Sequence, residues 1–293
     1  MTVATQNSIT DPPLPVQPFR LIEPKGSVVP VIFASPHSGN YYPETFQDQL
    51  VVPLMDLRRT EDAFVDQLFD SVADLGATQL CGLYGRAYVD LNRDARELDE
   101  NMFLDGLPRI AGQQSARVKA GLGSLPRVGA SGREIYSSKI SRAEGRERLD
   151  GIHDSYHDTL HETLERFKLR WSDTLLIDCH SMPSRQAGRS SLPDIVLGDR
   201  FGSSCSPRLT SLVERRFRKL GLSVSRNAPY AGGYTTRRYG RPRQGTHALQ
   251  IEINRGLYMR EDTIEVLPAF TDLKAALHDV AGEIVGLAKS DGL

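Results

Sequence analysis

The chain of 293 residues is long enough for one large α/β domain or at most two domains, because single hydrophobic cores stop growing at about 250–300 residues. Its 36 Lys and Arg residues balance 37 Asp and Glu residues, which excludes recognition of nucleic acid or a membrane through bulk charge. The three cysteines (Cys81, Cys179 and Cys205) are odd in number and widely spaced. We therefore expect neither a disulfide framework nor a zinc site made of cysteines. We also expect the protein to reside in a reducing compartment.

The amino-terminal segment is polar and rich in proline, with no basic region followed by an apolar run, so it does not have the pattern of a secretory signal. No stretch of the sequence approaches the apolar length of a membrane span. We expect a loose leader over residues 1–17, a single α/β domain over residues 18–293, and a cytoplasmic protein.

The first predicted elements alternate between strand and helix. Val28–Ser35 is a short apolar run that ends at a turn, as buried strands do. Apolar residues recur at helical spacing from Leu54 to Leu75, and Gly76 is placed to cap that helix. Two strands are expected next, over Thr78–Tyr84 and Ala87–Leu91.

Glu97–Ser138 is rich in Gly, Pro and Arg and has weak periodicity, so we expect a long irregular excursion. The longest helical pattern follows over Ser141–Trp171. Further along, the sequence predicts strands over Thr174–Cys179, Asp194–Gly198 and Leu222–Ser225, a helix over Pro207–Leu220, a loop over Ala231–Gly245, a strand over His247–Asn254 and a last helix over Phe270–Ala288. Strands that alternate with helices imply a largely parallel or mixed sheet covered on both faces.

Polar residues stand where several of these strands end. In open α/β sheets, ligands bind beyond the carboxyl ends of the strands. The candidates are His37, Asn92, Arg93, Asp178, His180, Glu252 and Asn254. Two histidines and a carboxylate with an open position for water would form a zinc hydrolase site.

Each candidate also has a plainer interpretation. His37 could lie in a turn after Pro36 without binding a metal. His180 is the stronger candidate, because a charged or polar group at the end of a buried strand needs a partner. Glu252 could instead form a salt bridge to a nearby arginine.

A second histidine cluster lies on the long predicted helix, where His153, His157 and His161 are four residues apart beside Glu162. Zinc helices use this spacing, but no HExxH motif occurs here. A solvated polar face is the favoured interpretation, with His157 as the one residue that could reach a pocket.

The sequence blocks SPHSGNYYP, TEDAFVDQLFD, GRAYVDLNRDAR, LLIDCHSMPS, PDIVLGDRFGSSC and NAPYAGGYTTRRYGRPRQGTHALQIEINRGLYM resemble, in this order, those of the N-formylglutamate amidohydrolases, also called N-formylglutamate deformylases. The resemblance covers most of the chain. It implies an α/β fold of the phosphorylase/hydrolase-like type, a mixed sheet flanked by helices that is akin to zinc carboxypeptidases and aspartoacylase. It also implies one zinc ion per chain and cleavage of a linear amide C–N bond.

The resemblance assigns the metal histidines to His37 and His180. The wider superfamily takes a glutamate three residues after the first histidine, and this chain has Asn40 there. The carboxylate must then come from elsewhere, and the TEDAFVD block implies Asp62, with Glu61 as its rival.

The resemblance also implies roles around the metal. Glu252 matches the catalytic glutamate, which would act as general base, and Arg86 matches an arginine that faces the scissile carbonyl. Asn92 and Arg93 resemble a pair that holds a substrate carboxylate. Arg237 matches an arginine of the family's own loop, and with Arg238 it would add positive charge for a dicarboxylate amide substrate.

Three functions remain open at this point. The first is hydrolysis of N-formyl-L-glutamate to formate and L-glutamate, which would belong to histidine catabolism. The second is a zinc amidase for another N-acyl amino acid or a short peptide. The third is a metal-binding or ligand-binding descendant without turnover, against which the presence of Glu252 argues, since such a protein needs no base beside the metal.

Overall fold

The structure is a computed structural model that describes residues 16–186 and 192–290. Residues 1–15 of the expected leader lie outside the described residues. Its main sheet has seven strands in the order β1-β3-β2-β4-β7-β5-β6. The strands are β1 (Phe19–Ile22), β2 (Val31–Ser35), β3 (Thr78–Gly82), β4 (Thr174–Met182), β5 (Ile195–Gly198), β6 (Val224–Arg226) and β7 (Thr246–Asn254).

The four central strands β3, β2, β4 and β7 run parallel to one another. β1 is antiparallel to β3, and β5 is antiparallel to β7. The predicted mixed α/β sheet is therefore confirmed. The carboxyl ends of β2, β4 and β7 meet at one edge, which is where such sheets place ligands.

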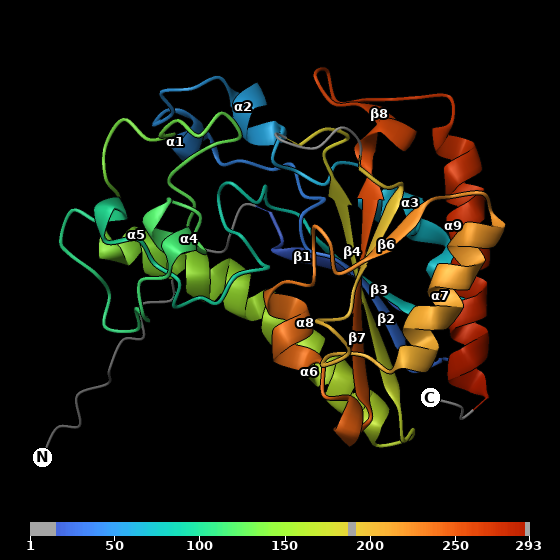
Figure 1. Ribbon diagram of the computed structural model, residues 1–293. Coiled ribbons are helices and arrows are strands. Elements are labelled where there is room, and N and C mark those ends of the chain that lie inside the picture. Colours follow the sequence, from blue (N-terminus) through green and yellow to red (C-terminus); the bar gives the residue numbers. More distant parts are fainter. Residues whose placement is uncertain (1–15, 187–191, 291–293) are drawn as a thin grey trace, which may run out of the picture.

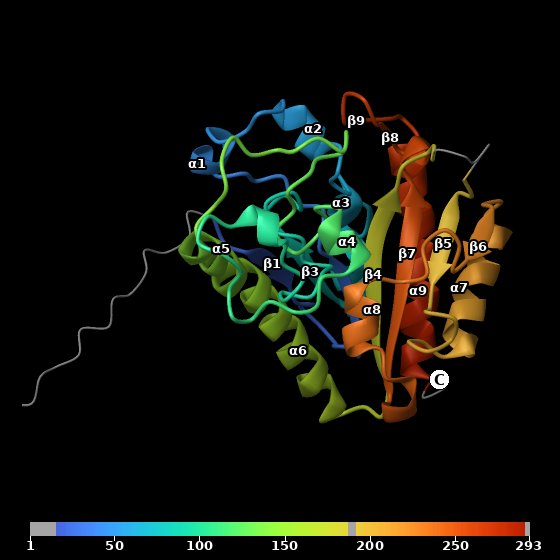
Figure 2. The same cartoon turned by 60° about the vertical axis from the view of Figure 1, so that its left-hand side comes forward.

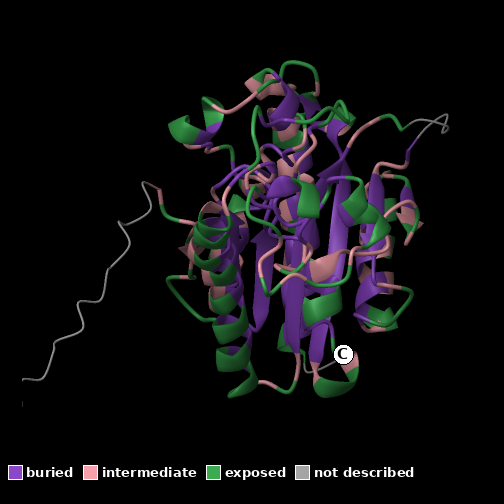
Figure 3. Ribbon diagram, turned by 90° about the vertical axis from the view of Figure 1, so that its left-hand side faces the viewer, coloured by how far each residue is buried: buried purple, intermediate pink, exposed green. Residues whose placement is uncertain are grey.

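Helices cover both faces of the sheet (Figures 1 and 2). Helices α3 (Val65–Leu68), α7 (Pro207–Lys219) and α9 (Phe270–Lys289) pack on one face. Helix α6 (Ser155–Lys168) packs on the other, together with the excursion between β3 and α5 (Arg142–Arg148). The central strands are buried along their length (Figure 3), which explains why β4 reads as an apolar run. The polar residues near its end are therefore buried as well.

Smaller elements complete the fold. They are α1 (Glu44–Gln47), α2 (Leu54–Arg58), α4 (Ala116–Lys119), α8 (Tyr234–Tyr239) and the two-stranded ribbon of β8 (Met259–Arg260) and β9 (Glu265–Val266). No helix in the described ranges is both long and apolar enough to cross a membrane. All three cysteines are buried and free.

The prediction of a single helix over residues 54–75 is wrong. The chain forms α2, leaves the helix at residues 59–64, and resumes as α3 and a 3-10 helix over Asp70–Leu75. The break has a physical cause, because the Asp62 amide donates to the His37 carbonyl at 3.0 Å and Phe64 has a left-handed φ of 65°. The break in the helix places Asp62 at the carboxyl edge of the sheet, next to His37.

Two other expectations need correction. Residues 87–91 form no strand; the Tyr88 amide donates to the Gly85 carbonyl at 2.8 Å, and the chain turns. The expected loop over residues 231–245 contains α8. Glycine is needed at Gly233, before this helix, since an added Cβ would lie 2.4 Å from Asn92 Nδ2.

The long helix expected over residues 141–171 forms, but it contains a π-helical turn over Leu149–Asp154 between α5 and α6. Ser141 caps its start by accepting from the Glu144 amide at 3.1 Å. A π turn inserts one extra residue per turn and so changes which side chains share a face. The turn contains His153, one of the three histidines singled out above.

Candidate metal site and hydrolase centre

Three buried side chains from separate segments converge at the carboxyl edge of the sheet. His37 follows β2, His180 lies near the end of β4, and Asp62 lies between α2 and α3. Each residue offers one ligand atom, and these atoms all lie within 4.8 Å of one another. The exposed fractions of these residues are only 1% for His37 and Asp62 and 3% for His180. Polar groups so deeply buried need partners.

The Nε2 atoms of the two histidines lie beside carboxylates. His37 Nε2 lies 2.7 Å from Asp90 Oδ1, and His180 Nε2 lies 3.0 Å from Asp178 Oδ1. For His37, the carboxylate beside Nε2 favours a proton there and leaves Nδ1 free to accept. The Nδ1 atoms of both rings face Asp62.

Asp62 lies between the two rings. Its Oδ2 atom is 2.9 Å from His180 Nδ1 and 3.4 Å from His37 Nδ1. Its Oδ1 atom accepts from Arg255 Nη2 at 3.0 Å and from Ser181 Oγ at 3.3 Å. Burial would raise the pKa of Asp62, but its hydrogen bond with His180 and the nearby ring of His37 hold that pKa well below its usual value. Arg255 therefore fixes the carboxylate with Oδ2 turned toward the histidines.

The surroundings of His180 also favour the charged ring in the absence of a metal. Burial alone would lower the pKa of His180, but the neighbouring carboxylate of Asp178 and the hydrogen bond with Asp62 raise it well above its usual value. The centre is thus a compact, buried cluster of histidines and carboxylates.

The donor set fits a zinc ion. Two imidazole nitrogens and one carboxylate oxygen are zinc ligands, and three protein ligands are what a catalytic site uses. His37 Nδ1 is buried and has no hydrogen-bond partner among the described residues, although it faces the interior of the group. A buried acceptor without a donor is costly, and a bound cation would satisfy it.

Glu61, the rival ligand, has other partners. Its Oε1 atom accepts from Tyr42 Oη at 3.0 Å, and its Oε2 atom lies 3.6 Å from Arg58 Nε. Burial raises the pKa of Glu61 to about 7. Asp62, rather than Glu61, is the carboxylate grouped with the histidines.

Glu252 lies on β7 in register with His180 on β4, so the two side chains extend from neighbouring strands at the same level. Its Oε1 atom accepts from Gln250 Nε2 at 2.8 Å. Burial raises the pKa of Glu252 to about 7. A carboxyl group with such a pKa can both take up and release a proton near neutral pH.

Arg86 lies on the turn after β3. Its Nη2 atom donates to Asp90 Oδ2 at 2.9 Å, and this carboxylate holds His37 through its other oxygen. Although burial opposes the charged form, the charges of Asp90 and Asp62 raise the pKa of Arg86 above its usual value. A positive charge held in place by Asp90 therefore stands beside the potential metal-binding residues His37, Asp62 and His180, which are called the metal group from here on.

Asn92 and Arg93 lie beside the same group. Asn92 Nδ2 is 3.2 Å from His180 Nε2, and Asn92 Oδ1 accepts from the amide of Thr235 at 2.8 Å. Arg93 is partly buried, and its Nη1 atom donates to the Asn92 carbonyl at 2.9 Å. Burial lowers the pKa of Arg93, and the charges of Arg86 and Arg117 lower it further.

The structure places Arg237 and Arg238 differently from the other predicted residues. Both lie on α8 and are exposed, and the Arg237 side chain keeps 54% of its surface accessible. Arg237 Nη2 lies 3.7 Å from Glu97 Oε1, and Arg238 Nη1 donates to Tyr234 Oη at 2.6 Å. They line an outer hollow rather than packing against the histidines.

The interpretation of His153, His157 and His161 as one solvated face is wrong for two of the three. His153 and His157 are buried, and only His161 is exposed. The two buried rings lie side by side, with centroids 4.5 Å apart. Both rings bond to backbone carbonyls of the residues on either side of Asn92.

Sequence reasoning missed Asp90 and Arg255. Asp90 stands two residues before Asn92 in the VDLNR block, and Arg255 directly follows the QIEIN strand. Both are charged residues at the boundary of an apolar run, and both are buried. That pattern was the available signal, because a buried charge implies a partner.

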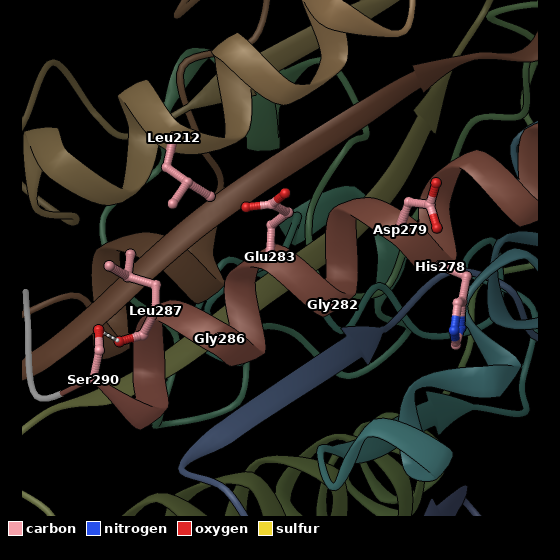
Figure 4. Close-up of a pocket in the computed structure, with 8 residues that line it drawn as sticks. All are labelled: Leu212, His278, Asp279, Gly282, Glu283, Gly286, Leu287 and Ser290. Atoms are coloured by element: carbon pink, nitrogen blue, oxygen red, sulfur yellow. Dashed lines mark hydrogen bonds between the residues drawn. The ribbon is translucent and has the colours of Figure 1, made fainter.

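A separate hollow of about 530 Å³ lies between α7 and α9, as Figure 4 shows. Its lining includes Leu212, Asp279 and Glu283. The two carboxylates lie 3.4 and 3.7 Å from Arg216 of α7. This hollow is a seam between two helices, and its lining includes no residue of the metal group.

Fold and site together define a mixed α/β protein with a potential metal-binding group of two histidines and an aspartate at the carboxyl ends of parallel strands. The sequence profile of the N-formylglutamate amidohydrolase family matches residues 29–259. The chain belongs to this family, whose members cleave an amide bond.

Similar proteins agree with this assignment. The chain is 33% identical over 240 residues to the N-formylglutamate deformylase of Pseudomonas aeruginosa and 31% identical over 238 residues to that of Pseudomonas putida. Each alignment covers 80% of this chain and 83% of the relative. The crystal structure of N-formylglutamate amidohydrolase from Ralstonia eutropha JMP134 is 35% identical, with a TM-score of 0.88 over 94% of this chain and 99% of that one.

Proposed function

We propose that this protein hydrolyses N-formyl-L-glutamate to formate and L-glutamate with one zinc ion per chain, held by His37, Asp62 and His180. The observation that carries the proposal is the buried group of these residues, in which His37 Nδ1 faces Asp62 and has no hydrogen-bond partner in the part of the chain that the structure describes. The names of the relatives supply the substrate. We also propose that the described part of the chain acts as a single domain, in the cytoplasm.

When bound, zinc acts as a Lewis acid and lowers the pKa of water in its coordination sphere to about 7. Glu252 would accept a proton from the attacking water and return it to the leaving nitrogen of the amide. Its pKa of about 7 suits both transfers. Arg86 would donate hydrogen bonds to the oxygen on which negative charge develops, and Asp90 keeps its guanidinium in place.

The substrate carries two carboxylates, and arginine side chains bind carboxylates through paired hydrogen bonds. Arg93, which is partly buried beside the metal group, would hold one of them together with Asn92. Arg237 and Arg238 are exposed, so a contact with the substrate requires them to turn inward from the outer hollow.

The alternative is a zinc amidase for another N-acyl amino acid. An assay of wild-type protein on N-formyl-L-glutamate and N-formyl-L-leucine separates the two. A mono-carboxylate leaves one arginine without its partner, which for a charge enclosed with the substrate costs about 2–5 kcal/mol, or roughly 30-fold to several thousand-fold in kcat/KM. Equal kcat/KM for the two substrates would contradict the proposed specificity, and absence of formate release from either would contradict the proposed activity.

A further inference from the structure

His153 and His157 form the most completely hydrogen-bonded histidine pair in the described part of the chain, and neither belongs to the potential metal-binding group. His157 Nε2 lies 2.8 Å from the carbonyl oxygen of Leu91, and His153 Nε2 lies 2.9 Å from that of Arg93. The two carbonyls flank Asn92. The rings therefore hold the backbone on both sides of a residue that contacts His180.

The protonation of His157 follows from its partners. A carbonyl only accepts, so the proton is on Nε2. Burial and the neighbouring His153 hold the pKa of His157 well below its usual value, so the ring is neutral. Its Nδ1 atom lies 3.0 Å from the hydroxyl oxygen of Tyr239 at the end of α8, and that hydroxyl donates to the His157 carbonyl at 3.0 Å. Because Thr235 at the start of α8 donates to Asn92, the ring bonds both segments that surround Asn92.

We propose that His153 and His157 are positioning residues, which fix the backbone on either side of Asn92 and thereby the orientation of its side chain toward the substrate. The side chain of Asn92 is held at both ends. Its Nδ2 atom contacts His180 Nε2, and its Oδ1 atom accepts from the amide and the hydroxyl of Thr235. This inference rests on the proposed function only for the choice of substrate. The hydrogen bonds themselves involve no metal ligand atom.

Two variants of equal size at position 157 test the proposal. His157→Leu fills the site without a donor, whereas His157→Gln retains an Nε2–H group that can reach the Leu91 carbonyl. We expect His157→Leu to lower kcat/KM for N-formyl-L-glutamate by about 10-fold to 100-fold, mainly through a higher KM, because small misplacements of binding groups are costly. His157→Gln should stay within about threefold of wild type in kcat/KM, since it keeps the bond that positions the backbone.

The matched control is His161→Leu, one turn further along α6, where the side chain is exposed. It should leave kcat, KM and zinc content unchanged. Zinc content should also be unchanged in both position-157 variants, because neither touches a ligand. If His157→Leu does not fold, the same pair of variants at His153 provides the test, since that ring bonds the other carbonyl.

A second measurement is independent of the substrate. Hydrogen exchange of the amides of Asn92 and Arg93, which donate to Asp90, should be faster in His157→Leu than in wild type or His157→Gln. Faster exchange in a protein that does not hydrolyse N-formyl-L-glutamate would support the positioning role and refute only the proposed function. Equal exchange, or equal losses of kcat/KM in the Leu and Gln variants, would show that these rings are packing elements and overturn the proposal.

Discussion

Two pairs of buried histidines in this protein are alike in burial and differ in how their ring nitrogens are used. The rings of His37 and His180 have centroids 4.9 Å apart, and those of His153 and His157 are 4.5 Å apart. Every nitrogen of the second pair has a hydrogen-bond partner. In the first pair, His37 Nδ1 has none among the described residues.

The difference shows that partners, rather than proximity or burial, distinguish a potential metal site from a structural pair. Carboxylates lie beside the Nε2 atoms of His37 and His180 and leave their Nδ1 atoms facing Asp62. Backbone carbonyls occupy the Nε2 atoms of His153 and His157, whose Nδ1 atoms face Asp154 and Tyr239. The first pair can accept a cation, and the second is already satisfied.

The largest expected effect is on the first pair. His180→Ala removes one of the proposed ligands, and kcat should fall by at least about 10⁴-fold, because metal assistance contributes several kcal/mol and each 1.4 kcal/mol is tenfold. Formate release is the measurement, with His161→Leu as a variant of an exposed histidine that should retain full activity. Near-normal kcat in His180→Ala would remove it from the proposed centre.

The next effect separates chemistry from metal binding at the same edge of the sheet. Glu252→Gln keeps the shape of the side chain and removes the base, so kcat should fall by at least about 100-fold while zinc content stays that of wild type. Wild-type kcat/KM should also rise with pH as Glu252, whose pKa burial raises to about 7, loses its proton. A variant with near-normal kcat would reduce Glu252 to a structural residue.

The arginines provide a smaller contrast between a partly buried and an exposed side chain. Arg93→Ala should lower kcat/KM for N-formyl-L-glutamate by roughly 30-fold or more, because it leaves a substrate carboxylate without its charged partner. Arg237→Ala should have a smaller effect, since its side chain is 54% exposed. The same variants are assayed on N-formyl-L-leucine. A residue that binds the second carboxylate should lose less kcat/KM on this substrate than on N-formyl-L-glutamate. A larger loss in Arg237→Ala would mean that α8 turns inward when substrate binds.

The smallest effect concerns stability beside Asp62. Burial raises the pKa of Glu61 from 4.5 to about 7, so the folded protein binds this proton more tightly than the unfolded chain. Glu61 therefore contributes stability that is fully present below pH 4.5 and is lost as the pH rises through about 7. The loss corresponds to about 3 kcal/mol. Glu61→Gln should lack it.

Denaturant unfolding of zinc-free protein at pH 4.5, 6 and 8 measures this difference, with Glu100→Gln as the control because that carboxylate is exposed. Relative to wild type, Glu61→Gln should become more stable as the pH rises, whereas Glu100→Gln should not. Parallel pH profiles of wild type and Glu61→Gln would contradict the shifted pKa.

Local patterns predicted much of the framework that carries the site. The apolar run before His180 and the alternation before Glu252 identified β4 and β7, because buried strands leave a periodic signal in their own residues. The break between α2 and α3 left no such signal. It depends on a hydrogen bond between Asp62 and His37, which are far apart in sequence.

The same limit explains the misread histidines. Spacing alone placed His153, His157 and His161 on one helical face, but only His153 and His157 lie against the segment whose Leu91 and Arg93 carbonyls they bond. Asp90 and Arg255 were missed because their importance lies in bonds to His37 and Asp62 from distant segments. Tertiary partners, which no local window contains, determine these positions.

The most direct test is a zinc titration of chelator-treated protein followed by native mass spectrometry. Wild type and His157→Leu should each take up about one zinc ion per chain, and His180→Ala should take up none at the same free zinc concentration. That result would place the metal at His37 and His180 rather than at His153 and His157. Zinc retained in His180→Ala, or lost in His157→Leu while the protein remains folded, would contradict the distinction between the two pairs.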